Sequence, residues 1–235
     1  MISKQQITEM FELQDRLNRH INRNWKNADY NWPTAIMAEC QEVVDQVGWK
    51  WWKQYERATP MQINLEVVDI WHFLLSAYLE CGAGTTSLVQ ARIKQEPDHW
   101  FIGKPVDDAH IIRRAQVLSA CAGTYGVHEP LRMLPEFFSL MRACRLSFDD
   151  LEQLYRKKAT LNLFRLDNGY RSNQYVKDWL GEEDNVYLEK IITENPKLAT
   201  AEIEKLLSGR YAEVLAARRI FPNPHQRTNH EAVSD

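Results

Sequence analysis

The stretch from residue 63 to residue 79 (INLEVVDIWHFLLSAYL) constrains the fold most, because a helix built from it is apolar on almost every side. Its polar residues include Glu66, Asp69, His72 and Ser76, which fall at i, i+3, i+6 and i+10 and so share one narrow strip. Carboxylates on a buried helix are costly unless they are paired or bound to a metal. The segment therefore predicts a buried helix whose acidic strip has a specific partner.

Helical periodicity dominates the rest of the chain as well and predicts an all-α fold, a helical bundle. Only nine glycines and nine prolines occur among the 235 residues, and the alternating runs typical of strands are scarce. We expect one domain over residues 1–221, with an irregular loop at 164–181, and then a disordered polar tail over 222–235. Gly82 and Gly84 are expected to end the third helix. The expected helices cover roughly residues 4–24, 33–48, 61–82, 108–126, 130–145, 148–163, 184–194 and 200–219.

Composition argues against several classes of protein. The formal net charge is −3, from 29 basic and 32 acidic residues, whereas a nucleic-acid binder usually has a basic excess. The four cysteines are scattered without a C-x-x-C pair, which fits a reducing cytosol and argues against a zinc site or a disulfide framework. No apolar run reaches the length of about 18 residues that a membrane span needs, and no signal-peptide core is found. A cytoplasmic protein with no stable nucleic-acid or membrane binding is expected.

A second pair of carboxylates lies on the helix expected at 33–48. Glu39 and Glu42 are three residues apart at the margin of an apolar stripe, so their side chains are neighbours on one face. A short connection joins this helix to the one expected at 61–82, so the two should pack antiparallel with their carboxylate pairs facing each other. Four converging carboxylates repel one another, and a hard divalent cation such as Mg²⁺ relieves that repulsion.

Plainer interpretations stay open for these residues. A Glu-x-x-Glu pair on a helix is most often a solvated face, and Glu66 and Asp69 could pair with Lys or Arg instead of a metal. The presence of both pairs on neighbouring helices favours the metal. His72 continues the acidic strip, and it either supports the site or is a hydrogen-bonded histidine of the core.

Two further segments carry groups that suit a nucleotide. One of them is residues 48–55 (GWKWWKQY), which connect the two carboxylate helices. In this segment Trp49 can stack on a base and Lys53 can bind phosphate. The same segment could instead be an apolar lid with its lysines extended into solvent. On the first helix, Gln14 and Asn18 lie within an apolar stripe, where amides are either satisfied core groups or groups that read a base edge.

The runs AECQEVVDQVGWKWWK (38–53) and LEVVDIWHFLLS (65–76) resemble the all-α dimeric dUTPases. That family belongs to the all-α NTP pyrophosphohydrolases, which include MazG-like and HisE-like enzymes. The wider group shares an E-x-x-E…E-x-x-D metal pattern, which stands here as Glu39, Glu42, Glu66 and Asp69.

Three further motifs narrow the resemblance to the dUTPases. An L-Q-x-x-L-N motif occurs at residues 13–18, and a W-K-x-W-K loop occurs at residues 49–53. A motif similar to K-N-x-L-N-x-F-R-x-x-x-G-Y begins at Lys158 and ends at Tyr170. The resemblance thus covers both ends of the chain, over about residues 10–190.

The resemblance implies a dUTP diphosphatase that converts dUTP, and also dUDP, to dUMP and so keeps uracil out of DNA. It implies a homodimer and two or three Mg²⁺ ions on the four carboxylates, with Mn²⁺ as a substitute. The implied catalytic residues are a proton acceptor and four groups that hold the phosphate chain: Glu42, Lys158, Arg165, Tyr170 and Lys177. The implied nucleotide-binding residues are Gln14, Asn18, Trp49, Lys53, His72 and Asn162.

Other functions remain as alternatives. A related pyrophosphohydrolase would act on dCTP or on a broader range of NTPs with the same chemistry. A non-catalytic module could use the segment from Trp49 to Lys53 to stack single-stranded nucleic acid, which leaves Glu66 and Asp69 unexplained. An interaction protein that kept the fold without the activity is the third alternative.

Overall fold

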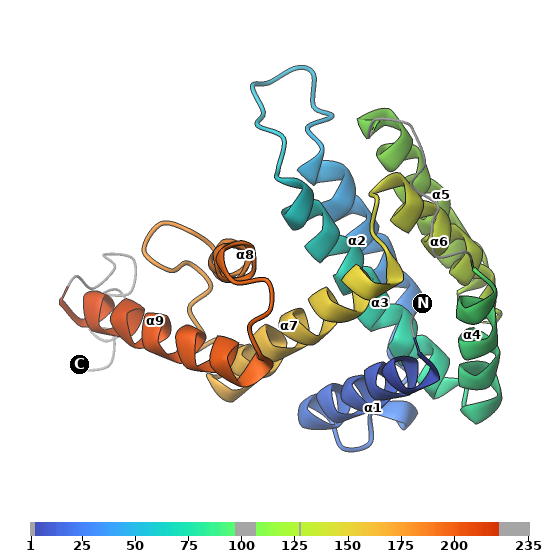
Figure 1. The fold of residues 1–235 in the computed structure, drawn as a ribbon, viewed down its shortest axis with the longest axis horizontal. Coiled ribbons are helices and arrows are strands. Elements are labelled where there is room, and N and C mark those ends of the chain that lie inside the picture. Colours follow the sequence, from blue (N-terminus) through green and yellow to red (C-terminus); the bar gives the residue numbers. More distant parts are fainter. Residues whose placement is uncertain (1–2, 97–106, 127, 221–235) are drawn as a thin grey trace, which may run out of the picture. The chain divides into compact units, whose positions relative to one another are not determined.

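The computed structural model describes residues 3–96, 107–126 and 128–220 (Figure 1). Within these residues the chain forms helices joined by loops, and the pairing of extended backbone is limited to an isolated bridge between Asp178 and Glu183. The predicted all-α fold is therefore confirmed. The α-helices are α1 (Lys4–Ile21), α2 (Trp32–Gln46), α3 (Pro60–Glu80), α4 (Ala83–Gln95), α5 (Asp108–Tyr125), α6 (Met133–Ala143), α7 (Phe148–Asp167), α8 (Asp184–Glu194) and α9 (Thr200–Ile220). Short 3₁₀ helices are η1 (Trp25–Asn27), η2 (Pro130–Arg132) and η3 (Tyr170–Ser172).

The chain divides into two compact units, residues 1–166 and residues 167–235. The first holds α1 to α6 and nearly all of α7, and the second holds α8 and α9. A single domain over residues 1–221 stays a prediction, and the tail predicted to be disordered at 222–235 lies outside the described residues. Across the described ranges, no helix combines the length and apolar character that a membrane span requires.

Helix α3 is the buried centre of the first unit, with α1, α2 and α4 packed against it. Its side chains Val67, Ile70 and Leu74 have no exposed surface, and the ring of Trp71 stacks on Phe137 of α6 at a centroid distance of 5.0 Å. The buried helix predicted from the apolar run is thus confirmed. Each such side chain contributes about 1.5–3 kcal/mol through its removal from water.

Two helix boundaries differ from the predictions. Gly82 does end α3, with a φ of +95° that favours glycine, but α4 begins at the next residue and Gly84 lies inside it. Helix α7 continues to Asp167, so the first residues of the loop predicted at 164–181 are helical. The helix is followed by Gly169, whose φ of +86° is left-handed. Periodicity does not predict α4 because its amphipathic pattern is weak, and because Gly82 lies directly before it and Gly84 within its first turn.

The second unit builds an irregular loop on an aromatic core. Trp179 is fully buried between Tyr187 of α8 and Tyr211 of α9, with ring centroids 5.5 Å away in both cases. Its indole nitrogen donates to the carbonyl of Val176 at 2.8 Å, and the Val176 amide donates to the hydroxyl of Tyr211 at 3.0 Å. These contacts hold residues 168–183 in a defined path whose regular structure is limited to η3 and the bridge between Asp178 and Glu183.

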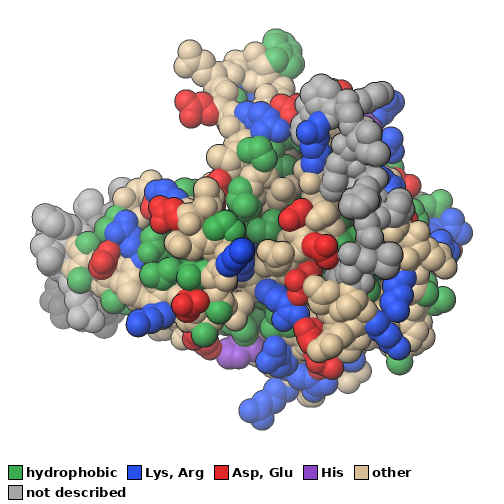
Figure 2. All heavy atoms as spheres, viewed as in Figure 1, with side chains coloured by type: hydrophobic (Ala, Val, Ile, Leu, Met, Phe, Trp, Pro, Cys, Tyr) green, Lys and Arg blue, Asp and Glu red, His purple; other side chains and the backbone are tan. Residues whose placement is uncertain are grey.

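Surface charge is mixed in sign. On the face drawn in Figure 2, basic and acidic side chains are interspersed and do not gather by sign. This distribution agrees with the small formal net charge of −3.

Candidate active site

Two capped helices carry the predicted carboxylates. Helix α2 begins after Asn31, whose side chain accepts a hydrogen bond from the Thr34 amide at 3.1 Å. Helix α3 begins after Thr59, whose hydroxyl accepts from the Gln62 amide at 3.1 Å. Both helices have proline in the first turn, which suits the unpaired amides there. The apolar face of α2, which includes Ile36, Cys40, Val43 and Val44, is buried, and α2 packs against α3.

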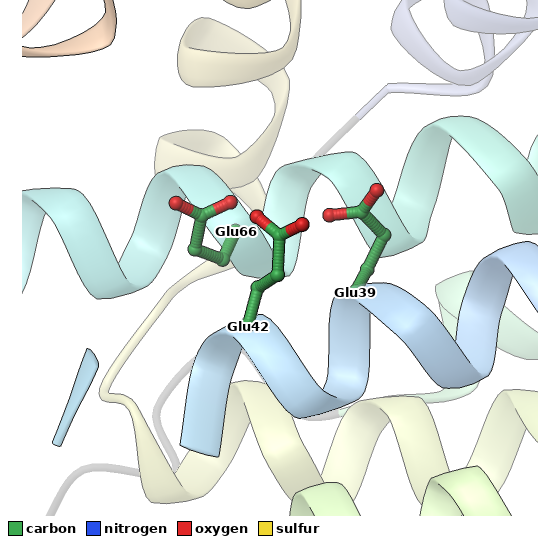
Figure 3. A group of neighbouring side chains, drawn as sticks. All are labelled: Glu39, Glu42 and Glu66. Atoms are coloured by element: carbon green, nitrogen blue, oxygen red, sulfur yellow. The ribbon is translucent and has the colours of Figure 1, made fainter. Parts of the chain in front are cut away.

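Three of the four predicted ligands converge. Glu39 and Glu42 extend from α2 toward Glu66 on α3 (Figure 3), and one carboxylate oxygen of each lies within 4.8 Å of the others. Glu66 is buried, Glu39 is half-buried and Glu42 is exposed to solvent. One oxygen of Glu66 accepts a hydrogen bond from Gln46 at 3.3 Å, and the other is buried with no partner among the described residues. A buried carboxylate oxygen without a hydrogen-bond partner is able to coordinate a cation.

The electrostatics of this cluster favour a bound cation. Burial, together with the neighbouring carboxylates of Asp69, Glu42 and Glu66, raises the pKa of Glu39 to about 8, against the opposing ammonium of Lys158. Burial also raises the pKa of Glu66 to about 7, again opposed by Lys158. The ionised forms of both groups are therefore costly near neutral pH. A hard divalent ion with oxygen ligands would remove that cost, so the donor set fits Mg²⁺.

Asp69, the fourth predicted ligand, contacts a lysine. Its Oδ2 atom lies 2.7 Å from the Nζ atom of Lys158, whose side chain is fully buried on α7. Pairing of the acids of α3 with a Lys or Arg is one of the alternatives that the sequence allows, and for Asp69 such a pair forms. The resemblance implies that Lys158 binds the phosphate chain, and no spacing in the sequence predicts that this lysine lies beside Asp69.

The polar face of α7 continues beyond Lys158. Asn162 and Arg165 follow at i+4 and i+7, so the three side chains lie along one side of the helix. The guanidinium of Arg165 donates to the amide oxygen of Asn162 at 3.1 Å. Both are half-buried, which leaves them accessible to a ligand.

Gln14 and Asn18 belong to a buried hydrogen-bond network between α1 and α3. The amide nitrogen of Gln14 donates to Asn18 and to Ser76, both at 3.0 Å, and the amide nitrogen of Asn18 donates to Ser76 at 2.9 Å. The amide oxygen of Gln14 lies 2.7 Å from Nδ1 of His72 and 3.0 Å from the hydroxyl of Tyr155. These contacts use every donor and acceptor of Gln14, whereas those of Asn18 use one N–H and one lone pair.

His72 has its tautomer set by this network. Because the oxygen of Gln14 only accepts, Nδ1 of His72 carries the hydrogen and Nε2 presents a lone pair. Nε2 is buried and has no hydrogen-bond partner among the described residues. Burial lowers the pKa of His72 to about 4, although nearby Asp69 opposes the effect. The ring is thus a neutral group of the core that offers one acceptor.

Asp45 holds the aromatic segment, by which we mean residues 48–55, in place. This role of Asp45 is not among the predictions from the sequence. Its carboxylate accepts from the indole nitrogen of Trp49 at 2.7 Å and pairs with Lys50 at 3.0 Å. The hydrogen bond from Trp49 is the main cause that lowers the pKa of Asp45. Trp51 is 86% exposed and Lys53 is exposed, so the segment does not form the packed lid that was one alternative. The signal was present in the sequence, because Asp45 lies three residues after Glu42 on α2.

Tyr170 and Lys177 lie on the loop of the second unit. Tyr170 is exposed, and its ring centroid lies 5.9 Å from that of Tyr175. Lys177 forms an ion pair with Glu183 at 3.3 Å. The hydroxyl of Tyr175 in turn donates to the fully buried carboxylate of Asp184 at 2.7 Å, which fixes this part of the loop to the start of α8.

A comparison with protein families matches most of this chain. A family model described as dUTPase matches residues 6–170, from the first turn of α1 to the start of η3. The matched span includes the four carboxylates of α2 and α3, whereas Lys177 lies beyond it. A comparison with curated proteins gives no match.

Proposed function

The chain belongs to the dUTPase family, and from this membership we propose that the carboxylate cluster of α2 and α3 is where it hydrolyses dUTP. The membership makes the chain a dUTP diphosphatase and thus a hydrolase. The convergence of Glu39, Glu42 and Glu66 is the observation that supports this location, because their carboxylate oxygens could together hold a divalent cation. We propose that the products are dUMP and pyrophosphate, that dUDP is also accepted, and that the reaction keeps uracil out of DNA.

Mg²⁺ is the ion that we propose for this site, in two or three copies, with Mn²⁺ as a substitute. Its ligands would be Glu39, Glu42, Glu66 and Asp69. Carboxylate oxygens suit both ions, and the unpartnered buried oxygen of Glu66 supports a cation at this position. When bound, the metal would neutralise phosphate oxygens and lower the pKa of a coordinated water.

We propose that Glu42 accepts the proton of the attacking water. Among the three converging carboxylates, it is the one most exposed to solvent, so it can reach a water and pass the proton on. Glu39 and Glu66 are less suited to this step because their surroundings disfavour the ionised form. A positioned carboxylate base contributes about 10²–10⁴-fold to a rate.

The groups that we propose for the phosphate chain are the ones that the resemblance implies. Arg165 suits two-pronged binding of phosphate oxygens, and Asn162 beside it would contact the sugar or orient the guanidinium. Lys158, Tyr170 and Lys177 are the other groups that we assign to the phosphates, because each offers a donor for the charge that develops in the transition state.

The residues that we propose for the base lie on α1 and on the segment 48–55. We propose that Asn18 reads the edge of uracil, because its network leaves it one free N–H and one lone pair. Gln14 would hold Asn18 in place, since all of its own groups are used. Trp49 would stack on the base and Lys53 would add positive charge at the phosphate side. His72 would offer its Nε2 acceptor to a donor of the nucleotide.

The test is a substrate panel with Mg²⁺. Incubation with dUTP should yield dUMP and pyrophosphate, with much slower turnover of dCTP and dTTP. Glu42→Gln should lower the rate by at least about 100-fold, whereas Glu12→Gln, which changes an exposed glutamate of α1, should leave it unchanged. No dUMP from dUTP, or full activity in Glu42→Gln, would contradict the proposal. Equal turnover of dCTP would indicate a broader pyrophosphohydrolase.

We also propose a cytoplasmic homodimer. The four cysteines are free, which suits a reducing compartment. Light scattering after size-exclusion chromatography measures the mass directly, and a mass of 27.6 kDa would indicate a monomer and contradict the dimer.

A further inference from the structure

The side chain of Lys158 is fully buried and lies in the carboxylate cluster. Its ammonium is 2.7 Å from Asp69, whose side chain is 17% exposed. A buried ammonium needs a counter-charge, and a buried carboxylate needs a cation. The ion pair gives each of the two charges an opposite charge beside it.

The influence of this lysine extends beyond Asp69. Lys158 opposes the rise in pKa of both Glu39 and Glu66, so its positive charge acts on the carboxylates of α2 as well as on those of α3. Asp69 is the second cause of the raised pKa of Glu39, which places its charge close to the converging trio. The lysine thus stands where a cation for four carboxylates is needed.

We propose that Lys158 is a tethered counter-cation: it occupies Asp69 in the metal-free protein, and a divalent ion must displace its ammonium before Asp69 can join Glu39, Glu42 and Glu66 as a ligand. This inference rests on the proposed metal site. It explains why three carboxylates converge while the fourth is turned to a lysine. An ammonium and a divalent ion beside the same carboxylate repel each other, so the two cations compete for Asp69.

The displaced ammonium stays close, because its backbone is fixed in α7. Lys158 shares a helix face with Asn162 and Arg165, so a released ammonium would lie beside the groups that we assign to the nucleotide. Metal binding would then release the ammonium of Lys158, which could bind the phosphates of the nucleotide. The same lysine would weaken metal binding and strengthen phosphate binding.

The experiment measures Mn²⁺ binding without nucleotide, from the electron paramagnetic resonance signal of the free ion. Lys158→Met removes the charge and retains the length of the side chain. We expect it to tighten Mn²⁺ binding by about tenfold or more, since one charge-assisted hydrogen bond no longer has to break. Lys157→Met is the matched control, because it removes the same charge one position along α7, where burial lowers the pKa of the lysine. It should change Mn²⁺ affinity little.

A double-mutant cycle identifies the partner. In the background of Asp69→Asn, which has no charge to contest, Lys158→Met should no longer tighten Mn²⁺ binding. With saturating Mg²⁺, Lys158→Met should also weaken the binding of pyrophosphate, measured by calorimetry. Circular dichroism checks folding, and Lys158→Gln replaces the methionine variant if that one does not fold.

The outcomes separate this inference from the proposed function. If wild-type protein binds no Mn²⁺, the proposed metal site itself is wrong. If wild-type protein binds Mn²⁺ but the Lys158 variants bind it equally or more weakly, only the competition is wrong. A tightening that persists in Asp69→Asn would also overturn it, because Lys158 would then act through another group.

Discussion

Replacing Glu66 by glutamine should stabilise the metal-free protein at pH 8 while it removes metal binding. Burial raises the pKa of this carboxyl from 4.5 to about 7, with the neighbouring acids adding to the effect against Lys158. A raised carboxyl pKa contributes stability that is complete below pH 4.5 and is lost as the pH rises through 7. Glutamine carries no charge at any of these pH values, and its oxygen can still accept from Gln46.

The size of the effect follows from the two pKa values. A change from 4.5 to about 7 corresponds to roughly 3 kcal/mol of differential stability between the protonated and ionised forms. For a chain of this length, each kcal/mol shifts the unfolding temperature by about 2–4 °C, so the variant should unfold roughly 6–12 °C higher at pH 8. The new amide hydrogens have the carboxylate of Glu42 nearby as an acceptor.

Thermal unfolding followed by circular dichroism in EDTA, at pH 5 and pH 8, provides the assay. Glu66→Gln and wild type should differ little at pH 5 and by the full amount at pH 8, with Glu12→Gln as the exposed control. The difference between proteins is the quantity to compare, because the lowered pKa of His72 makes stability rise with pH over part of the same range. Saturating Mg²⁺ should stabilise wild type by about 2.7 kcal/mol at 100 times its Kd and the variant much less.

The reasoning is refuted if Glu66→Gln is less stable than wild type in EDTA at pH 8. It is equally refuted if the difference between the two proteins does not grow between pH 5 and pH 8. Either result would mean that the ionised carboxylate is stabilised in the metal-free fold.

Three further predictions test other parts of the site. Gln14→Leu should lower the free energy of unfolding by about 3 kcal/mol in a urea titration, because it leaves buried polar partners unpaired. Asp45→Asn should leave global stability within about 1 kcal/mol, because its ion pair with Lys50 is partly exposed to solvent, and yet speed proteolytic cleavage of residues 48–55. Mn²⁺ binding measured by calorimetry should tighten from pH 6 to pH 9, because protons leave Glu39 and Glu66 over that range.

Each of these has a result that would count against it. A near-neutral Gln14→Leu would mean that water replaces the lost amide. Unchanged proteolysis in Asp45→Asn would show that other contacts hold the aromatic segment. Mn²⁺ affinity independent of pH would show that Glu39 and Glu66 are already ionised at pH 6.

The helical architecture and the first part of the site could be predicted from the sequence because they depend on local spacing. Glutamates three residues apart on a helix share a face whatever the rest of the chain does, which places Glu39 and Glu42 together. The apolar surroundings of Glu66 indicate its burial directly. Helix α4 escaped prediction for the same reason, since its residues have little periodicity to detect.

Contacts between residues distant in sequence required the tertiary structure. Whether Asp69 would face a metal or a lysine depended on where α7 packs, and no spacing within α3 carries that information. From the sequence, the side-chain amide of Gln14 could bind a base or join a hydrogen-bond network of the core. In the structure it lies within hydrogen-bond distance of His72 and Tyr155, so it belongs to the network. Hydrogen bonds and ion pairs require the positions of their atoms to be right to within a fraction of an ångström, and packing sets those positions.

The carboxylates show the division most clearly. The order of the amino acids is enough to predict an all-α chain in which two helices present acids at helical spacing, because side-chain direction in a helix follows from 3.6 residues per turn. The packing of the helices is needed to show that Glu39, Glu42 and Glu66 converge while Asp69 pairs with Lys158. Carboxylates that packing brings together repel one another unless a cation lies between them. Whether that cation is a lysine or a metal ion depends on the folded chain.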